Sequence, residues 1–149
     1  MLVAIETVPL QTFDGPFADE LFFAGRVIFG LVLAFTGLNH FLDLENMAGY
    51  AEFKGVPAPK LSVVASGVVL IAGGLGVALG VFPALAAAAL AGFLLVTTPM
   101  MHDFWAAPEE ERQTEMTHFL KNVGLFAASI ALLAVSALEW PYALGLTVF

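Results

Sequence analysis

The sequence predicts an all-α fold, an integral membrane antiparallel four-helix bundle with a short interfacial helix between the first and second spans. The first observation is composition: 60% of the 149 residues are hydrophobic and only 12% are charged. The mean hydropathy of +0.91 is far above that of a soluble domain. The second observation is four apolar runs, each near the ~20 residues that a helix needs to cross a bilayer. They occupy about residues 21–41, 61–79, 82–101 and 118–138, and together they make residues 1–149 a single transmembrane domain.

The absence of cysteine and the acidic charge balance exclude several classes of function. Without cysteine the chain forms no disulfide, binds no metal through thiolates and carries out no thiol–disulfide exchange. The formal net charge of -8 and the pI near 4.5 argue against nucleic acid as a partner and against docking on anionic lipid through a basic patch. The expected partner is the lipid bilayer itself, and electrons for any redox role must come from elsewhere.

The segment before the first span, residues 1–20, contains acidic residues but no lysine or arginine. It therefore lacks the positively charged start of a signal peptide. Pro9, Gly15 and Pro16, with Phe13 and Phe17, indicate an irregular or short helical segment at the membrane interface. A disordered tail is the alternative.

The first span carries a polar residue near each end, Arg26 near its start and Asn39 with His40 at its finish. At about 1.5 Å per residue, Arg26 and His40 lie about 21 Å apart along the helix, so they address opposite sides of the membrane. Two environments suit Arg26. Its guanidinium either snorkels to the outer interface or forms a structural ion pair, which we favour. The candidate partners of this ion pair are Asp19, Glu20 and Glu139.

A short helix on the membrane surface is expected over residues 43–53, because Leu44, Met47, Ala48 and Ala51 recur at helical spacing. Pro57 and Pro59 then separate it from the second span. The second and third spans are joined by a turn of only a few residues, which makes them antiparallel. Small residues recur along the first three spans and favour close helix packing. They include Gly25, Gly30, Ala34, Gly37, Gly67, Gly73, Gly74, Gly76, Ala84, Ala88 and Gly92.

Pro108 and the glutamates after it begin a further helix that continues into the fourth span and ends near Leu138. Trp140 and Tyr142 mark an interfacial stop. Basic residues lie between spans one and two and between or beside spans three and four, at Lys54, Lys60, Arg112 and Lys121. The positive-inside rule then predicts a multi-pass protein of the cell membrane with both termini extracytoplasmic.

The predicted topology brings all three histidines of the chain, His40, His102 and His118, to the cytoplasmic side of the bundle. Glu115 precedes His118 by three residues and shares its helix face. We regard these residues as candidates for ligand binding or proton relay; no residue is assigned a catalytic role. The full candidate set is His40, His102, His118, Asp103, Glu115, Trp105, Asn39 and Lys121. The alternative is that these side chains only contact lipid headgroups and helix ends.

Several segments together resemble the DoxX family of small four-helix membrane proteins. They are Arg26, GLNHF at 37–41, AEFKGVPAP at 51–59, GGL at 73–75, HDFW at 102–105 and HFLKN at 118–122. The resemblance covers nearly the whole chain after residue 20. It implies a membrane subunit linked to quinone-dependent oxidoreductases, because the family takes its name from a thiosulfate:quinone oxidoreductase and other members are associated with redox-stress complexes. A soluble or membrane redox partner is implied with it.

The residues support part of this chemistry. Imidazoles at His40, His102 and His118 would donate hydrogen bonds to quinone carbonyls and carry protons, with Asp103 or Glu115 orienting a ring nitrogen. Because the chain has no redox group of its own, a partner or bound cofactor must supply electrons. Haem is disfavoured because the histidines lie at the membrane edge, and no metal is expected because their spacing matches no ligand motif.

Two other classes of function stay open. The small-residue stripes and the lack of redox groups suit a non-catalytic membrane scaffold or assembly protein, and a homo-oligomer is compatible with them. A binder of a small apolar molecule or lipid would need a sizeable cavity between helices.

Overall fold

The computed structural model describes residues 15–147, and within them the chain is all helical, as predicted. The helices are α1 (Ala18–Leu42), α2 (Leu44–Phe53), α3 (Pro59–Leu79), α4 (Pro83–Met101) and α5 (Glu109–Ala134). All but the ten-residue α2 are long and apolar enough to cross a membrane. The interfacial segment expected before the first span lies mostly outside the described residues.

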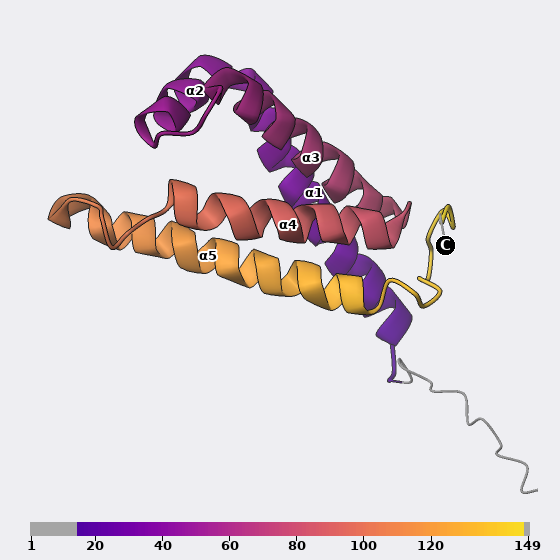
Figure 1. The fold of residues 1–149 in the computed structure, drawn as a ribbon. Coiled ribbons are helices and arrows are strands. Elements are labelled where there is room, and N and C mark those ends of the chain that lie inside the picture. The colour runs from indigo at the N-terminus through magenta and orange to yellow at the C-terminus, as the bar shows by residue number, and fades with distance from the viewer. Residues whose placement is uncertain (1–14, 148–149) are drawn as a thin grey trace, which may run out of the picture.

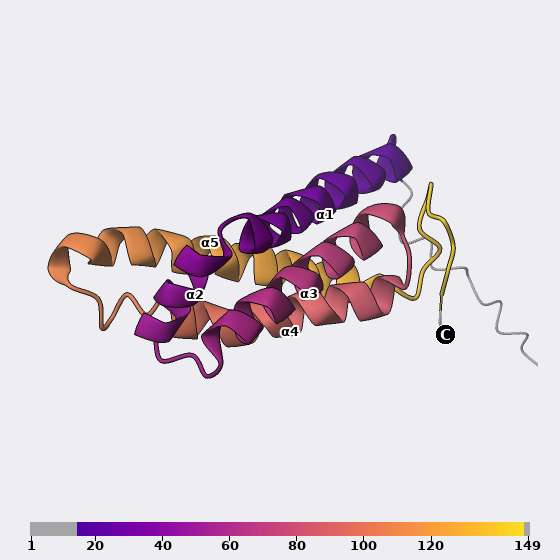
Figure 2. The ribbon, with the colours of Figure 1, turned by 90° about the horizontal axis from the view of Figure 1, so that it is seen from above.

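The four long helices form two antiparallel pairs, α1 with α3 and α4 with α5, which are joined through the tight turn between α3 and α4 (Figure 1). The pairs lie close together at this turn and diverge away from it. The short helix α2 lies at the wide end, beside the start of α3, as the view from above also shows (Figure 2). The bundle is therefore splayed at the end that carries the polar loops.

Two pairs of facing glycines bring α1 and α3 into close contact. A Cβ atom added at Gly30 would come within 2.3 Å of the Gly74 carbonyl oxygen, and one added at Gly74 within 2.4 Å of the Gly30 carbonyl oxygen. Seven residues further along α1, a Cβ atom added at Gly37 would come within 2.8 Å of the Gly67 carbonyl oxygen. No other residue type leaves room for such backbone contact.

The helix expected to begin after Pro108 and to continue into the fourth span is α5. It begins at Glu109, as predicted, because Pro108 and three glutamates favour a helix start there, and it ends at Ala134 rather than near Leu138. The Trp140 indole N–H donates to the Val135 carbonyl at 2.9 Å, and this bond helps to turn the chain away from the helix axis. The residues after α5 then run back across the end of α3 and the start of α4.

Arg26 occupies neither of the two environments considered from the sequence. Its side chain is buried, with 1% relative exposure, so it does not snorkel. Its guanidinium donates to the carbonyls of Val77 and Ala78, at 3.3 and 2.9 Å, and to that of Pro141 at 2.6 Å. Among the described residues no carboxylate pairs with it, and the candidate partners Asp19, Glu20 and Glu139 are exposed.

The physical reason for this difference is the C-terminal end of α3. The last carbonyls of a helix have no partner within the helix, and a cation is favourable there. The guanidinium satisfies two of them and also binds the C-terminal segment, while the rings of Phe23 and Trp140 flank it at 5.2 and 5.5 Å. Arg26 therefore ties α1, α3 and the C-terminal segment together.

Candidate functional site

A cavity of about 720 Å³ lies at the wide end of the bundle, with walls from all five helices. Its inner part is apolar and its outer part is polar. The apolar side chains include Leu33, Leu70, Phe93, Leu94 and Leu125, and the polar ones include Thr36, His40, Asn46, Tyr50, Ser62, Ser66, Thr97, His102, Lys121 and Asn122. A molecule with a polar head and an apolar body matches this division.

Three of the eight candidate residues line the cavity: His40 from α1, His102 just after α4, and Lys121 from α5. His118 does not line it but stacks on His102, with ring centroids 5.1 Å apart. The end of α1, the end of α4 and the N-terminal part of α5 thus lie at the same end of the bundle, and His40 and His102 line the same cavity. The expectation that the imidazoles share one ligand stays a prediction.

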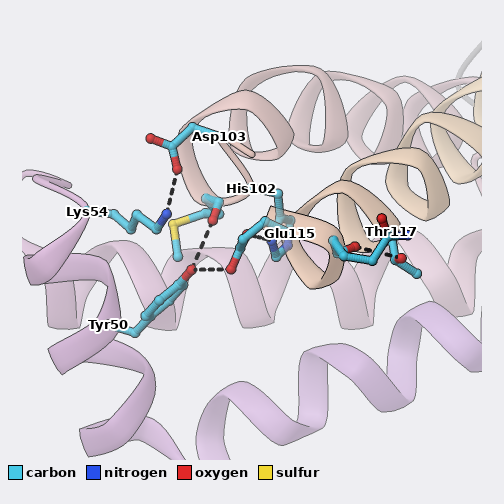
Figure 3. Close-up of polar contacts among 8 residues, drawn as sticks. Tyr50, Lys54, His102, Asp103, Glu115 and Thr117 are labelled. Atoms are coloured by element: carbon cyan, nitrogen blue, oxygen red, sulfur yellow. Dashed lines mark hydrogen bonds and ion pairs between the residues drawn. The ribbon is translucent and has the colours of Figure 1, made fainter. Parts of the chain in front are cut away.

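Glu115, on α5, connects α2 and the end of α4 through two hydrogen bonds (Figure 3). Its carboxylate accepts a hydrogen bond from His102 Nδ1 at 2.9 Å and another from the Tyr50 hydroxyl at 3.1 Å. The same hydroxyl lies 3.1 Å from the Met101 carbonyl oxygen. Burial and the hydrogen bond to Glu115 raise the pKa of Tyr50, so this hydroxyl stays protonated as a donor. The network fixes α2 against the end of α4 and the start of α5.

Asp103 forms a second link across the wide end, an ion pair with Lys54 at 2.5 Å (Figure 3). The hydrogen bond from Lys54 lowers the pKa of Asp103 below its ordinary value. Burial by itself would lower the pKa of Lys54, but the hydrogen bond to Asp103 helps to outweigh it and the pKa is raised. Both groups therefore stay charged at neutral pH. Asp103 lies outside the cavity wall and braces it.

Two candidate residues stand apart from the cavity. Trp105 packs edge-on against Phe104 and Phe119 and is 57% exposed, as expected of an aromatic residue at a membrane interface. Asn39 also does not line the cavity. Its backbone carbonyl accepts the amide of Asp43 at the end of α1.

No motif in the sequence pointed to Tyr50 as a site residue, and Lys54 contributed only to the predicted orientation and to the family resemblance. Tyr50 lies on the face of α2 that carries Met47 and Ala51, and Lys54, just after the helix, continues that face at helical spacing. Met47 and Ala51 line the cavity beside Tyr50. The pattern that could have indicated these residues is their spacing: Tyr50 and Lys54 extend the apolar stripe of Met47 and Ala51 with polar groups. Composition alone does not reveal such spacing.

The fold and the cavity define a multi-pass helical membrane protein with an amphipathic cavity between its helices. A protein-family model described as DoxX matches residues 21–103, which is more than half of the chain. The chain therefore belongs to the DoxX family. The searches of the curated proteins and of the solved structures found no match. Helix α5, which contributes Glu115, His118 and Lys121, lies beyond the matched residues.

Proposed function

We propose that the protein binds a membrane quinone in the cavity at the wide end of the bundle and is the quinone-facing or anchoring subunit of a membrane oxidoreductase. The observation that supports this most directly is the cavity itself. Its volume of about 720 Å³ falls in the range of sites for small organic molecules, about 300–1,000 Å³.

The lining residues fit the chemistry of a quinone. The oxygens on the ring of a quinone or hydroquinone need hydrogen-bonding partners. Lys121 offers a donor, and His40 and His102 offer ring nitrogens, at the outer part of the cavity. The isoprenoid tail needs an apolar path, which Leu70 and Leu94 begin. Because the chain has no cysteine or other redox group of its own, its residues bind and orient the quinone, and a redox partner or a bound cofactor exchanges the electrons.

Filling the cavity tests the proposal. Thr97 lines the cavity, and its hydroxyl donates to the carbonyl four residues earlier at 2.8 Å. Thr117 makes the same kind of bond at 2.9 Å on an exposed face of α5, which supplies a matched control. We expect Thr97→Phe to weaken binding of a decyl-substituted benzoquinone about tenfold or more, and Thr117→Phe to leave it unchanged. Calorimetry on the protein in detergent micelles measures both.

The same measurement separates the proposal from its alternatives. A non-catalytic scaffold gives no saturable quinone binding in the unmodified protein. A binder of another lipid or apolar molecule gives no quinone binding either, but mass spectrometry of the purified protein then detects a bound small molecule that Thr97→Phe releases. Equal affinity in the Thr97→Phe and Thr117→Phe variants would place any quinone outside the cavity.

We also propose that the wide end faces the cytoplasm and that both termini are extracytoplasmic in the cell membrane. Lys54, Lys60 and Arg112 all lie at the wide end, which supports this orientation. Since the chain has no cysteine, single cysteines report each side cleanly. In intact cells a membrane-impermeant maleimide should label Glu139→Cys and not Glu110→Cys, two exposed glutamates near opposite ends of α5. The reverse pattern would invert the orientation.

A further inference from the structure

The two histidines that line the cavity, His40 and His102, have the same ring nitrogen engaged. His40 Nδ1 lies 2.9 Å from the Thr36 carbonyl oxygen on its own helix. His102 Nδ1 lies 2.9 Å from Glu115 Oε2. In both rings Nε2 has no hydrogen-bond partner within residues 15–147. Nε2 is therefore the ring nitrogen left to bind a ligand in the cavity that both residues line.

The chemistry of these partners fixes where the ring hydrogen lies. A carbonyl oxygen only accepts, so His40 Nδ1 must carry the hydrogen that is donated to Thr36. A neutral imidazole has one N–H, and its other nitrogen is then an acceptor. In neutral His40, therefore, Nε2 carries a lone pair.

Glu115 fixes the ring hydrogen of His102 in the same way. Glutamate is ionised at neutral pH and its carboxylate then only accepts hydrogen bonds. One of its oxygens is already directed at the Tyr50 hydroxyl and the other at His102 Nδ1. Nδ1 of His102 is thus the donor, and neutral His102 also offers Nε2 as an acceptor. Glu115 is a positioning residue, because it sets this tautomer without lining the cavity.

We infer that the cavity binds its ligand through hydroxyl donors, which means that it prefers the reduced hydroquinone to the oxidised quinone. This inference rests on the proposed function. A quinone carbonyl only accepts, so it gains nothing from two acceptor nitrogens, whereas a hydroquinone hydroxyl donates to one of them. The structure thereby revises the expectation that these imidazoles donate hydrogen bonds to quinone carbonyls.

Lys121 also lines the cavity and is compatible with this preference. Its ammonium group only donates. A hydroxyl group both donates and accepts, so a hydroquinone can donate to an imidazole and accept from Lys121. An ether oxygen or a quinone carbonyl can accept a hydrogen bond from Lys121 but cannot donate one to an imidazole.

Three probes with the same decyl chain test the inference: a hydroquinone, its dimethyl ether and the corresponding benzoquinone. Their affinities are compared under argon at pH 8.5, where histidine side chains are generally neutral. We expect the hydroquinone to bind about tenfold more tightly than either of the other two, because only it can donate to Nε2. Equal affinities of the three probes would overturn the inference and leave the proposed function standing. Failure of all three to bind would overturn both.

Variants locate the effect. At least one of His40→Phe and His102→Phe should remove most of the preference for hydroquinone over its ether. His118→Phe is the matched control, because His118 stacks on His102 but does not line the cavity, and phenylalanine preserves an aromatic ring. Loss of the preference in the control and not in the two cavity variants would refute the assignment.

A second readout does not depend on any ligand. Nitrogen-15 chemical shifts distinguish a protonated imidazole nitrogen from an unprotonated one. At pH 8.5 we expect His40 and His102 to carry hydrogen on Nδ1 and none on Nε2. Glu115→Leu removes the acceptor at His102, so the His102 signals should shift while those of His40 stay unchanged. Hydrogen on Nε2 of either ring in the unmodified protein would contradict the proposal.

Discussion

Replacing Gly30 with alanine is expected to destabilise the bundle by about 3 kcal/mol, which corresponds to a fall of about 6–12 °C in the melting temperature in detergent. The new methyl group would lie 2.3 Å from the Gly74 carbonyl oxygen and 2.8 Å from the Ala78 nitrogen. Both obstacles are backbone atoms, which cannot rotate out of the way. Helices α1 and α3 must therefore separate along their main contact.

Gly25 on the same helix is the matched control for this prediction. A Cβ atom there meets nothing within 4 Å, so Gly25→Ala adds a methyl group on the open face of α1. Alanine is the better helix former by about 1 kcal/mol, a contribution too small to offset a backbone clash. The melting temperature of Gly25→Ala should stay the same or rise slightly. If both variants melted alike, the close crossing at Gly30 would be refuted.

Replacing Arg26 with methionine is expected to destabilise the protein by about 3 kcal/mol, less than the sum of its hydrogen bonds, because burying the guanidinium itself costs free energy. Hydrogen bonds from a charged donor contribute about 1.5–3 kcal/mol each, and this guanidinium makes three. Methionine fills the apolar space but leaves the carbonyls of Val77, Ala78 and Pro141 without this donor. Arg26→Lys should recover only part of the loss, because an ammonium group lacks the planar fork that spans two helix carbonyls and the C-terminal segment.

Hydrogen exchange gives this prediction a local readout. The C-terminal segment is held to the bundle by the Leu144 amide, which donates to Leu79, and by the Phe82 amide, which donates to Leu146. Exchange at Leu144 and Phe82 should accelerate in Arg26→Met, while amides at the wide end keep their protection. The exposed Arg112 provides the control, and Arg112→Met should change neither melting nor exchange. An unchanged melting temperature in Arg26→Met would show that its carbonyl contacts contribute little.

The sequence also indicated which residues gather at the wide end. Because consecutive spans are antiparallel, the ends of spans one and three and the start of span four must share one side, and His40, His102 and His118 occupy those positions. Spacing alone could not show which of the three would line a cavity. That depends on how each helix is rotated about its own axis, and the rotation is set by contacts such as Gly30 against Gly74.

The sequence by itself determined the helical class, the four spans and the short helix between the first two, since these follow from hydropathy, length and the positions of proline. It did not determine the hydrogen-bond partners of Arg26. The nearby acidic residues suggested an ion pair, whereas the guanidinium binds backbone carbonyls at the end of α3 and in the C-terminal segment. Nor did it determine which nitrogen of His40 and His102 is an acceptor. Only the tertiary structure decided these points, because each depends on atoms from separate elements, or on a side-chain rotamer, reaching hydrogen-bonding distance.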